Sequence, residues 1–329
     1  MRKFTTLLIS FLFATSLFAA KPKPAPVNED AFLVQKEISI WPTDQGFNSD
    51  VTVYSCQAVR LDENWFLTSA HCVYSACGTR PCTVDILLAE SAGLLARAKV
   101  NHSTTSQSVF IYRGFFPGQN RISGMDVALI KLDPKKAEYS YVNLEDGEPI
   151  TREEFQTKLR FDSEAQAQLN AKGVRLLSVA NMPTIQLKPQ IVVPKMMAGV
   201  LSYLPSPSPE VYYVQDLQHF IVPGFGVRQG NSGGGVFTRS GDLAGIVSSL
   251  LYNKDGTASF HDADGKTVLT LKNAKDLFMF TGFNGTTLNF IRTKVPNLRT
   301  VSVLPDFAVK SDKKFDSIVK AEEETSMQF

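Results

Sequence analysis

Three short stretches decide this chain: TSAHC at residues 68–72, DVALIKL at residues 126–132 and GNSGG at residues 230–234. Each offers one member of a nucleophilic triad, and the three arrive in the order His, Asp, Ser. A serine hydroxyl becomes a nucleophile when a base takes its proton and a second group fixes that base in one tautomer. Hydrogen-bond donors must also be placed to stabilise the oxyanion that forms. The sequence therefore points to acyl-transfer chemistry on a serine.

Ser232 is the candidate nucleophile. Glycines at positions 230, 233, 234 and 235 flank it, which permits a tight turn that presents Oγ and lets backbone N–H groups converge. We expect the N–H groups of Gly230 and Ser232 to form an oxyanion hole. A glycine-rich turn alone is usually an ordinary loop, so this assignment depends on the other two stretches.

His71 and Asp126 are the candidate base and orienting acid. His71 follows the apolar run 65–68 and adjoins Cys72, whereas Asp126 precedes an apolar strand. Taken singly, such a histidine is a surface or core residue and such an aspartate is a strand-end carboxylate. The plain reading suits the other three histidines, which are His102, His219 and His261. Together and in this order, the three residues predict that Ser232 attacks, His71 transfers protons and Asp126 orients His71.

The composition is that of an ordinary globular protein, with 43% apolar and 20% charged residues in a chain of 329. Residues 1–20 have the pattern of a secretory signal, with Arg2 and Lys3 ahead of the apolar run 4–18. A retained membrane anchor is the alternative, but the run is short for a full span. Removal of this segment leaves 32 Lys plus Arg against 32 Asp plus Glu, because Arg2 and Lys3 are lost from 34. We expect a secreted or periplasmic protein without a stable membrane anchor, and no nucleic-acid partner, since no basic stripe is present.

The four cysteines lie within 27 residues, at positions 56, 72, 77 and 82. An exported chain meets an oxidising compartment, which favours two disulfides. Zinc binding is the alternative, although no C-x-x-C pair is present. A bridge between Cys77 and Cys82 would close a small loop directly after the His71 stretch.

Short β-type runs separated by turn residues extend from residue 32 onward and predict an all-β protein. A helical connection is expected at about residues 151–173, a terminal helix at residues 286–295 and a hairpin turn at residues 262–265. The segment 251–275 either shapes a cleft or extends that hairpin. The expected organisation is a signal peptide (1–20), a Pro-rich leader (21–31), an N-terminal β-barrel (32–145), a C-terminal β-barrel (146–304) and a charged tail (305–329).

The chain resembles the chymotrypsin/trypsin family of serine proteases over roughly residues 32–300. The stretch from Cys56 to Cys72 resembles the family's segment that ends in the histidine box, and the stretches at 126–132 and 230–234 resemble its aspartate and serine boxes. This resemblance implies two antiparallel six-stranded β-barrels with the active site in the cleft between them. It implies a bridge between Cys56 and Cys72, a protein or peptide substrate, and no metal or organic cofactor.

Asn231 departs from the family's pattern. The animal digestive enzymes carry an aspartate at this place, and that aspartate receives the new N-terminal ammonium when a zymogen is cut. Asn231 cannot form this ion pair, and no Ile-Val-Gly-Gly stretch appears near residue 30. Our hypothesis is that local hydrogen bonds hold the oxyanion turn without insertion of a new N-terminus.

The resemblance places substrate contacts at Gly226, Ser248, Ser249 and Leu250. Gly226 would floor the specificity pocket, and because no carboxylate is there we expect no preference for Arg or Lys. Leu250 would shorten the pocket and favour small apolar side chains. Glutamate preference is a further alternative, but Val247 stands where a histidine would support it.

These residues together predict an exported serine endopeptidase that works through an acyl-enzyme. An esterase would share the acyl chemistry. The alternative from a different class is a catalytically silent relative that acts as a binding protein. Whether a protein inhibitor acts on the chain is not encoded in any motif.

Overall fold

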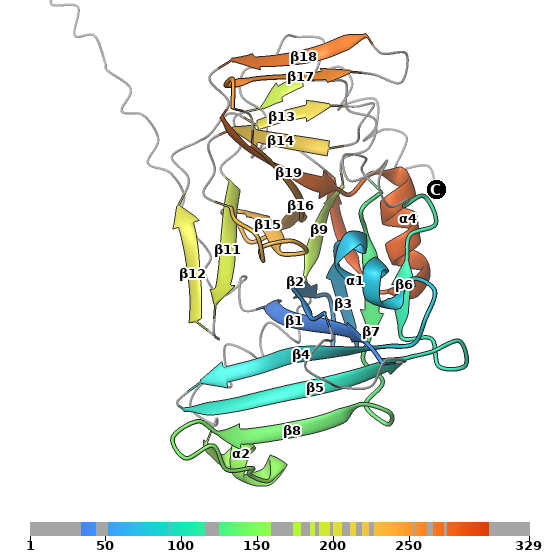
Figure 1. Ribbon diagram of the computed structural model, residues 1–329, viewed down its shortest axis with the longest axis vertical. Helices are drawn as coiled ribbons and strands as arrows, with labels where there is room; N and C mark the ends of the chain where they lie inside the picture. Colours follow the sequence, from blue (N-terminus) through green and yellow to red (C-terminus); the bar gives the residue numbers. More distant parts are fainter. Residues whose placement is uncertain are drawn as a thin grey trace, which may run out of the picture.

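The computed structural model describes residues 34–43, 52–91, 93–115, 125–158, 174–178, 185–187, 191–197, 200–205, 211–214, 219–223, 227–252, 254–261, 266–272 and 275–302 (Figure 1). The expected signal peptide, leader and charged tail lie outside these residues, as does Gly226. Of the expected helical connection, the described part is one short helix, α2 (Arg152–Lys158). No helix in the described part of the chain is long and apolar enough to cross a membrane.

The first sheet is antiparallel throughout, in the order β6-β7-β3-β2-β1-β4-β5-β8. Its strands are β1 (Gln35–Pro42), β2 (Tyr54–Arg60), β3 (Trp65–Thr68), β4 (Cys82–Ser91), β5 (Leu94–His102), β6 (Val109–Ile111), β7 (Ala128–Lys131) and β8 (Glu138–Asn143). After β5 the chain continues through residues 103–108 into β6, which pairs with β7 at the far end of the sheet. Because only six residues join β5 to β6, the two ends of the sheet lie close together, and the sheet curls back on itself.

Alternating side chains give this sheet one apolar face. Ile38 and Ile40 of β1 are fully buried, whereas the intervening Ser39 is partly exposed. The helix α1 (Ala70–Cys77) follows β3 directly and packs Val73 and Ala76 into the same core. The core of the first sheet thus sits beneath the helix that carries His71.

The second sheet is mixed, with strands in the order β10-β13-β14-β19-β16-β15-β11-β12. Off this path, β9 pairs with β16, and β20 pairs with β9. Two of its pairings are parallel, β9 with β16 and β9 with β20. Its strands are β9 (Arg175–Ser178), β10 (Ile185–Leu187), β11 (Ile191–Met197), β12 (Val200–Pro205), β13 (Val211–Val214), β14 (His219–Pro223), β15 (Gly235–Thr238), β16 (Leu243–Tyr252), β19 (Asp276–Gly282) and β20 (Arg299–Ser302). Phe220 and Phe280 stack at 4.5 Å between ring centroids in its core.

The all-β architecture with two curled sheets is confirmed, but six strands for each is wrong. The described residues hold eight strands in the first sheet and ten in the second. The first sheet gains β8 on its edge, and residues 103–108 separate β5, which pairs with β4 and β8, from β6, which pairs with β7. The second sheet gains four strands beyond the expected six, namely β10, β14, β19 and β20.

The segment 251–275 extends a hairpin, which was one of the two alternatives expected for it. Its strands are β17 (Thr257–His261) and β18 (Thr267–Lys272), and the expected turn at 262–265 lies outside the described residues. Phe260 and Leu271 of this hairpin pack against Ile221 and Met279, on the opposite face from the Phe220–Phe280 core. The hairpin covers the outer face of the second sheet at the top of Figure 1.

The expected terminal helix is confirmed as α4 (Gly285–Lys294). Asn284 caps it by accepting hydrogen bonds from the N–H groups of Thr286 and Thr287. Leu288 and Ile291 enter an apolar cluster that also contains residues of both sheets, such as Leu67 and Ile246. This shared cluster fixes one sheet against the other, and the candidate site depends on that contact.

Candidate active site

The start of α1 places His71 where the two sheets meet. Ser69 precedes the helix in an extended conformation, and its Oγ donates to the carbonyl oxygen of Val247 in β16 at 2.7 Å. Ser69 is fully buried, so this bond crosses the interface between the sheets. The first turn of α1 is therefore held against the second sheet.

Asp126 lies fully buried beside His71. Its Oδ2 is 2.7 Å from His71 Nδ1, and its Oδ1 accepts the backbone N–H of His71 at 2.8 Å. Ser248 Oγ donates to the same Oδ2 at 2.5 Å. A carboxylate at Nδ1 fixes the neutral imidazole with its proton on Nδ1, which leaves the lone pair on Nε2. His71 is thus oriented as a base, and the structure brings together the two residues that the sequence paired.

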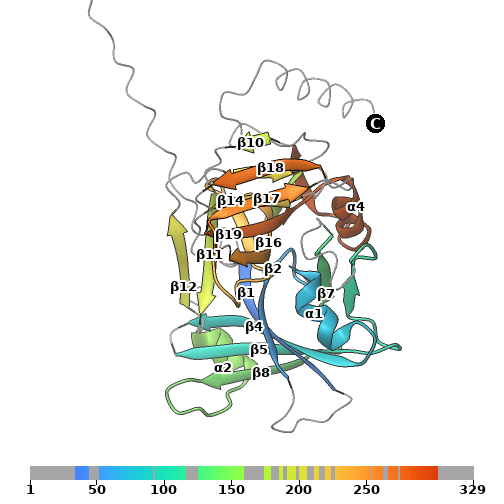
Figure 2. The same cartoon turned by 45° about the horizontal axis from the view of Figure 1, so that its top comes forward.

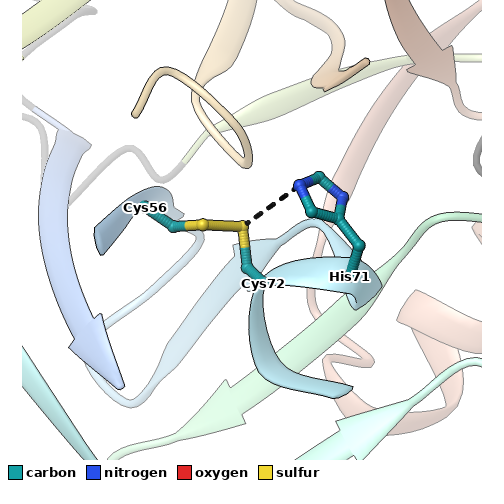
Figure 3. A group of neighbouring side chains, drawn as sticks. All are labelled: Cys56, His71 and Cys72. Carbon is teal, nitrogen blue, oxygen red and sulfur yellow. Dashed lines mark hydrogen bonds between the residues drawn. A yellow bond between two sulfur atoms is a disulfide. The ribbon is translucent and has the colours of Figure 1, made fainter. Parts of the chain in front are cut away.

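The other edge of the His71 ring faces a disulfide (Figure 3). Nε2 lies 3.8 Å from Cys72 Sγ, and Cys72 is bridged to Cys56. The second bridge joins Cys77 to Cys82, so both expected disulfides are present. The Sγ atoms of Cys56 and Cys72 and a ring nitrogen of His71 lie within 4.8 Å of one another, which resembles a metal-ligand spacing. Because both sulfurs are joined in the bridge, neither is a thiolate ligand, and the zinc alternative is wrong.

The glycine-rich turn before β15 is docked on the first sheet. The carbonyl oxygen of Ser232 accepts the N–H of Gln57 in β2 at 2.8 Å. Gly233 has a φ of +79°, and a Cβ there would lie 2.2 Å from both Gln57 O and Thr68 Oγ1. Only glycine fits so close to the end of β3. The turn therefore lies against Thr68, three residues before His71.

The N–H groups of Gly230 and Ser232 donate to no group in the described part of the chain. Gly230 has a φ of +90°, which turns the peptide unit away from an ordinary strand path. Ser232 itself is partly exposed, and its Oγ makes no hydrogen bond to His71 among the described residues.

Asn231 closes the turn from within. Its side chain is almost fully buried, and Oδ1 accepts the backbone N–H of Arg228 at 2.9 Å. Its own N–H donates to the carbonyl oxygen of Arg228 at 3.0 Å. These two bonds are neutral and local, which is the arrangement that the hypothesis of a turn held without a new N-terminus requires.

Two buried glutamines support the turn, and the sequence reasoning missed both. Gln35 Oε1 accepts the N–H of Gly235 at 2.8 Å, and Gln35 Nε2 donates to Gln57 Oε1. Both side chains are buried at the start of β1 and in β2. The available signal was a glutamine within each of two apolar strands, because a buried amide must find partners.

A cavity of about 570 Å³ adjoins the turn on the side of the second sheet. It is lined by Val227, Arg228, Gln229, Leu250, Tyr252, Asp276 and Leu277. Of the four expected substrate contacts, Leu250 lines this cavity and packs against the cluster that contains Val227 and Phe278. Ser248 stands at a bulge of β16, where Val247 and Ser249 have partners in β19, and its side chain is turned to Asp126.

Residues 39–188 match the protein-family model described as Trypsin, whereas no curated protein matches the chain. The chain is similar to three solved structures, namely an HL collagenase, a scabies mite inactivated protease paralogue S-I1 and a Glu endopeptidase bound to MPD. Their identities are 18%, 14% and 14%, with TM-scores of 0.40, 0.41 and 0.40. They cover 80%, 83% and 81% of this chain and 94%, 98% and 92% of their own. Such TM-scores do not establish a shared fold. The trypsin-like sequence match includes His71 and Asp126 and ends before Ser232.

Proposed function

We propose that the protein is an exported serine endopeptidase that cleaves peptide bonds through an acyl-enzyme on Ser232. The supporting observation is that elements of both sheets meet beside His71. His71 Nδ1 is paired with the buried Asp126, and the turn that carries Ser232 is docked within three residues of His71 at Thr68. The match of residues 39–188 to the trypsin family model supports the same chemistry.

The proposed reaction begins when Ser232 Oγ attacks the carbonyl carbon and its proton passes to His71 Nε2. The carbonyl oxygen becomes an oxyanion that accepts hydrogen bonds from the N–H groups of Gly230 and Ser232. Asp126 stabilises the imidazolium that results. His71 then gives its proton to the leaving amine as the C–N bond breaks, which leaves an ester on Ser232. A water then loses a proton to His71 and attacks the ester carbonyl carbon. As the C–Oγ bond breaks, His71 returns this proton to Ser232 Oγ, and the acid product departs.

The proposed substrate preference is for small apolar residues and against Arg and Lys. Val227 and Leu250 give the cavity beside the turn an apolar floor. Phe278 behind them is fully buried, so a long side chain has no deeper space to enter. Asp276 and Arg228 bring opposite charges to the rim of this cavity. Their charges cancel, so the rim gives no electrostatic preference for Arg or Lys in the substrate.

A binding protein without peptidase activity is the second candidate. The observation that favours it is that Ser232 Oγ makes no hydrogen bond to His71 among the described residues. Catalytic hydrogen bonds are often long in the absence of substrate and tighten in its presence. The intact set of His71, Asp126 and Ser232 therefore favours the peptidase.

A fluorophosphonate probe separates the two candidates, because it reacts only with an activated serine hydroxyl. Purified protein beginning at residue 21 would be labelled, and the adduct would be located by mass spectrometry. We expect a single adduct on Ser232 that is absent in Ser232→Ala. Ser259→Ala, an exposed serine on β17, is the matched control and should label as the wild type does. A folded protein that takes no label would contradict the proposal and favour the binding protein.

A further inference from the structure

A groove on the outer face of the first sheet lies apart from the proposed active site. It encloses about 530 Å³, within the range of small-molecule sites, and crosses β1, β4, β5 and β8. These strands lie side by side at the lower edge of the molecule (Figure 1, Figure 2). Odd-numbered residues of β1, β4 and β5 face the groove together with Glu138 of β8, whereas even-numbered ones such as Ile86 and Ala98 face the core beneath α1. A ligand here would touch none of the residues proposed for catalysis.

Cross-strand pairing arranges polar side chains in two rows along this groove. Ser39 pairs with Asp85, Asp85 with Lys99, and Lys99 with Glu138, which makes one row across four strands. The second row is Trp41, Thr83 and Asn101. Neighbouring strands lie about 4.8 Å apart, so the rows repeat hydrogen-bonding groups at that interval.

Asp85 carries the unsatisfied atom of the groove. Only 8% of the residue is exposed, and its Oδ2 pairs with Arg97 Nη1 at 3.0 Å. Its Oδ1 is buried and accepts no hydrogen bond in the described part of the chain. Because Oδ1 is covered by protein atoms, a ligand in the groove meets Asp85 and Arg97 as one neutral ion pair.

Charge balance indicates that a ligand of the groove is neutral. Asp85 already has Arg97 as its cation, and the exposed rim adds one charge of each sign, Lys99 and Glu138. A cationic ligand would meet Arg97 and Lys99, and an anionic ligand would meet Asp85 and Glu138. A ligand that carries only neutral hydroxyl groups meets neither repulsion.

The remaining lining offers both an apolar wall and further hydrogen-bonding groups. Trp41 and the 47% exposed Val53 form the apolar end. Thr83 Oγ1 donates to Asn101 Oδ1 at 2.8 Å, and Asn101 Nδ2 donates to Glu138 Oε1 at 3.3 Å, which fixes the orientation of the amide. An indole surface beside oriented amide, carboxylate and guanidinium groups suits a ring with one apolar face and hydroxyls at its edge. We propose that this outer groove binds a neutral oligosaccharide.

The two tryptophans of the chain make the groove directly observable. Trp65→Phe leaves Trp41 as the only indole, and Ser232→Ala in the same protein prevents self-cleavage. Cellotetraose, maltotetraose and tri-N-acetylchitotriose would be titrated while the emission of Trp41 is followed. We expect a saturable shift with at least one of them, of equal affinity at low and high ionic strength because the ligand is neutral.

Asn101→Ala tests the oriented amide. The substitution removes the side chain that Thr83 and Glu138 hold in place, so affinity should fall at least about tenfold. Tyr252→Ala removes an exposed aromatic from the other cavity and should leave binding unchanged. Calorimetric titration with Trp41→Ala should show no heat of binding, and circular dichroism checks that each variant is folded.

Three results would overturn the proposal: no response to any of the three saccharides, binding that survives Trp41→Ala, or binding of hexalysine or hexaglutamate peptides in their place. Because Ser232→Ala is present throughout, none of these results bears on peptidase activity. The labelling of Ser232 and the occupancy of the outer groove are therefore decided separately.

Discussion

Ser248 Oγ donates to Asp126 Oδ2 at 2.5 Å, and this bond joins the two sheets at the base of the candidate site. Ser248 belongs to β16 of the second sheet, whereas Asp126 lies two residues before β7 of the first sheet. Oδ2 also faces His71 Nδ1, so one oxygen serves both the histidine and the partner sheet. The orientation of His71 is thereby coupled to the packing of the sheet that carries Ser232.

The first prediction follows from that bond. Ser248→Ala removes one of three donors to a fully buried carboxylate and should lower kcat by about 10- to 100-fold, the value of a hydrogen bond to a charged group. Asp126→Asn should lower kcat by about 10⁴-fold, because it favours the wrong tautomer of His71. Both would be measured with a fluorogenic peptide, with Ser259→Ala as the control. Wild-type kcat in Ser248→Ala would show that Asp126 is held well enough without it.

The second prediction concerns the N-terminus. Arg228 and Asn231 close the turn through two neutral bonds, so no ammonium group is needed to order it. Chains that begin at residues 21, 28 and 32 should have equal kcat on one peptide. Asn231→Ala, which deletes the acceptor for the Arg228 N–H, should lower kcat in all three. Activity that appears only in the shortest chain would refute the hypothesis of a locally held turn.

The sequence was informative wherever chemistry is confined to a short stretch. The His71, Asp126 and Ser232 stretches each predicted a local conformation, and the run at residues 286–295, with Leu288 and Ile291 on one face, predicted α4. The pairing of Cys56 with Cys72 followed from the family resemblance and is present. In these places neighbouring residues determine the structure.

Contacts between distant residues were not predictable in the same way. The bond from Gln35 to Gly235 spans 200 positions, and the bond from Ser248 to Asp126 spans 122. Whether a polar residue in an apolar strand has a partner depends on how two sheets pack, which no local pattern encodes. The additional strand β8 was not predicted for a related reason. It is a polar edge strand, and its sequence lacks the alternation of buried and exposed residues that indicates a strand.

The third prediction compares the two disulfides. Cys56 and Cys72 are 16 residues apart, whereas Cys77 and Cys82 are 5 apart. The loop-entropy model gives the longer loop about 1 kcal/mol more stabilisation, with about 2–5 kcal/mol for its removal. Paired Cys→Ser variants of each bridge would be compared by urea unfolding. An equal or larger cost for the Cys77–Cys82 pair would show that the short bridge acts through native packing instead.

The fourth prediction concerns Lys36, whose amine is buried on β1 beside the core. Burial, and secondarily the like charge of Arg60, lower the pKa of Lys36 to about 7. Between this value and the unfolded value near 10.4, the unfolded chain binds a proton that the folded chain lacks. Stability from this residue therefore rises with pH across that window, by at most about 1.4 kcal/mol per pH unit, and its full cost is felt below pH 7.

Lys36→Met should accordingly stabilise the fold by a few kcal/mol at about pH 6 and by much less at about pH 10. Urea unfolding at several pH values would show the change as a flatter profile in the variant. Lys99→Met, an exposed lysine on β5, is the matched control and should leave the profile unchanged. A variant with the wild-type slope would mean that Lys36 is protonated in the folded state.

The last prediction concerns the proposed substrate preference. Leu250 lines the cavity beside the Ser232 turn and packs toward Val227 and Phe278. Leu250→Gly would remove this side chain and deepen the cavity, so kcat/KM should rise for peptides with an aromatic residue before the cleaved bond. The same variant should lose efficiency on peptides with Ala or Val there, because the apolar contact, worth about 1–3 kcal/mol, is gone. Tyr252→Ala, at the exposed rim of the same cavity, should leave that ratio nearly unchanged. Cleavage-site profiling by mass spectrometry of a digested protein mixture would give both ratios at once. An unchanged profile in Leu250→Gly would place the selecting pocket elsewhere on the chain.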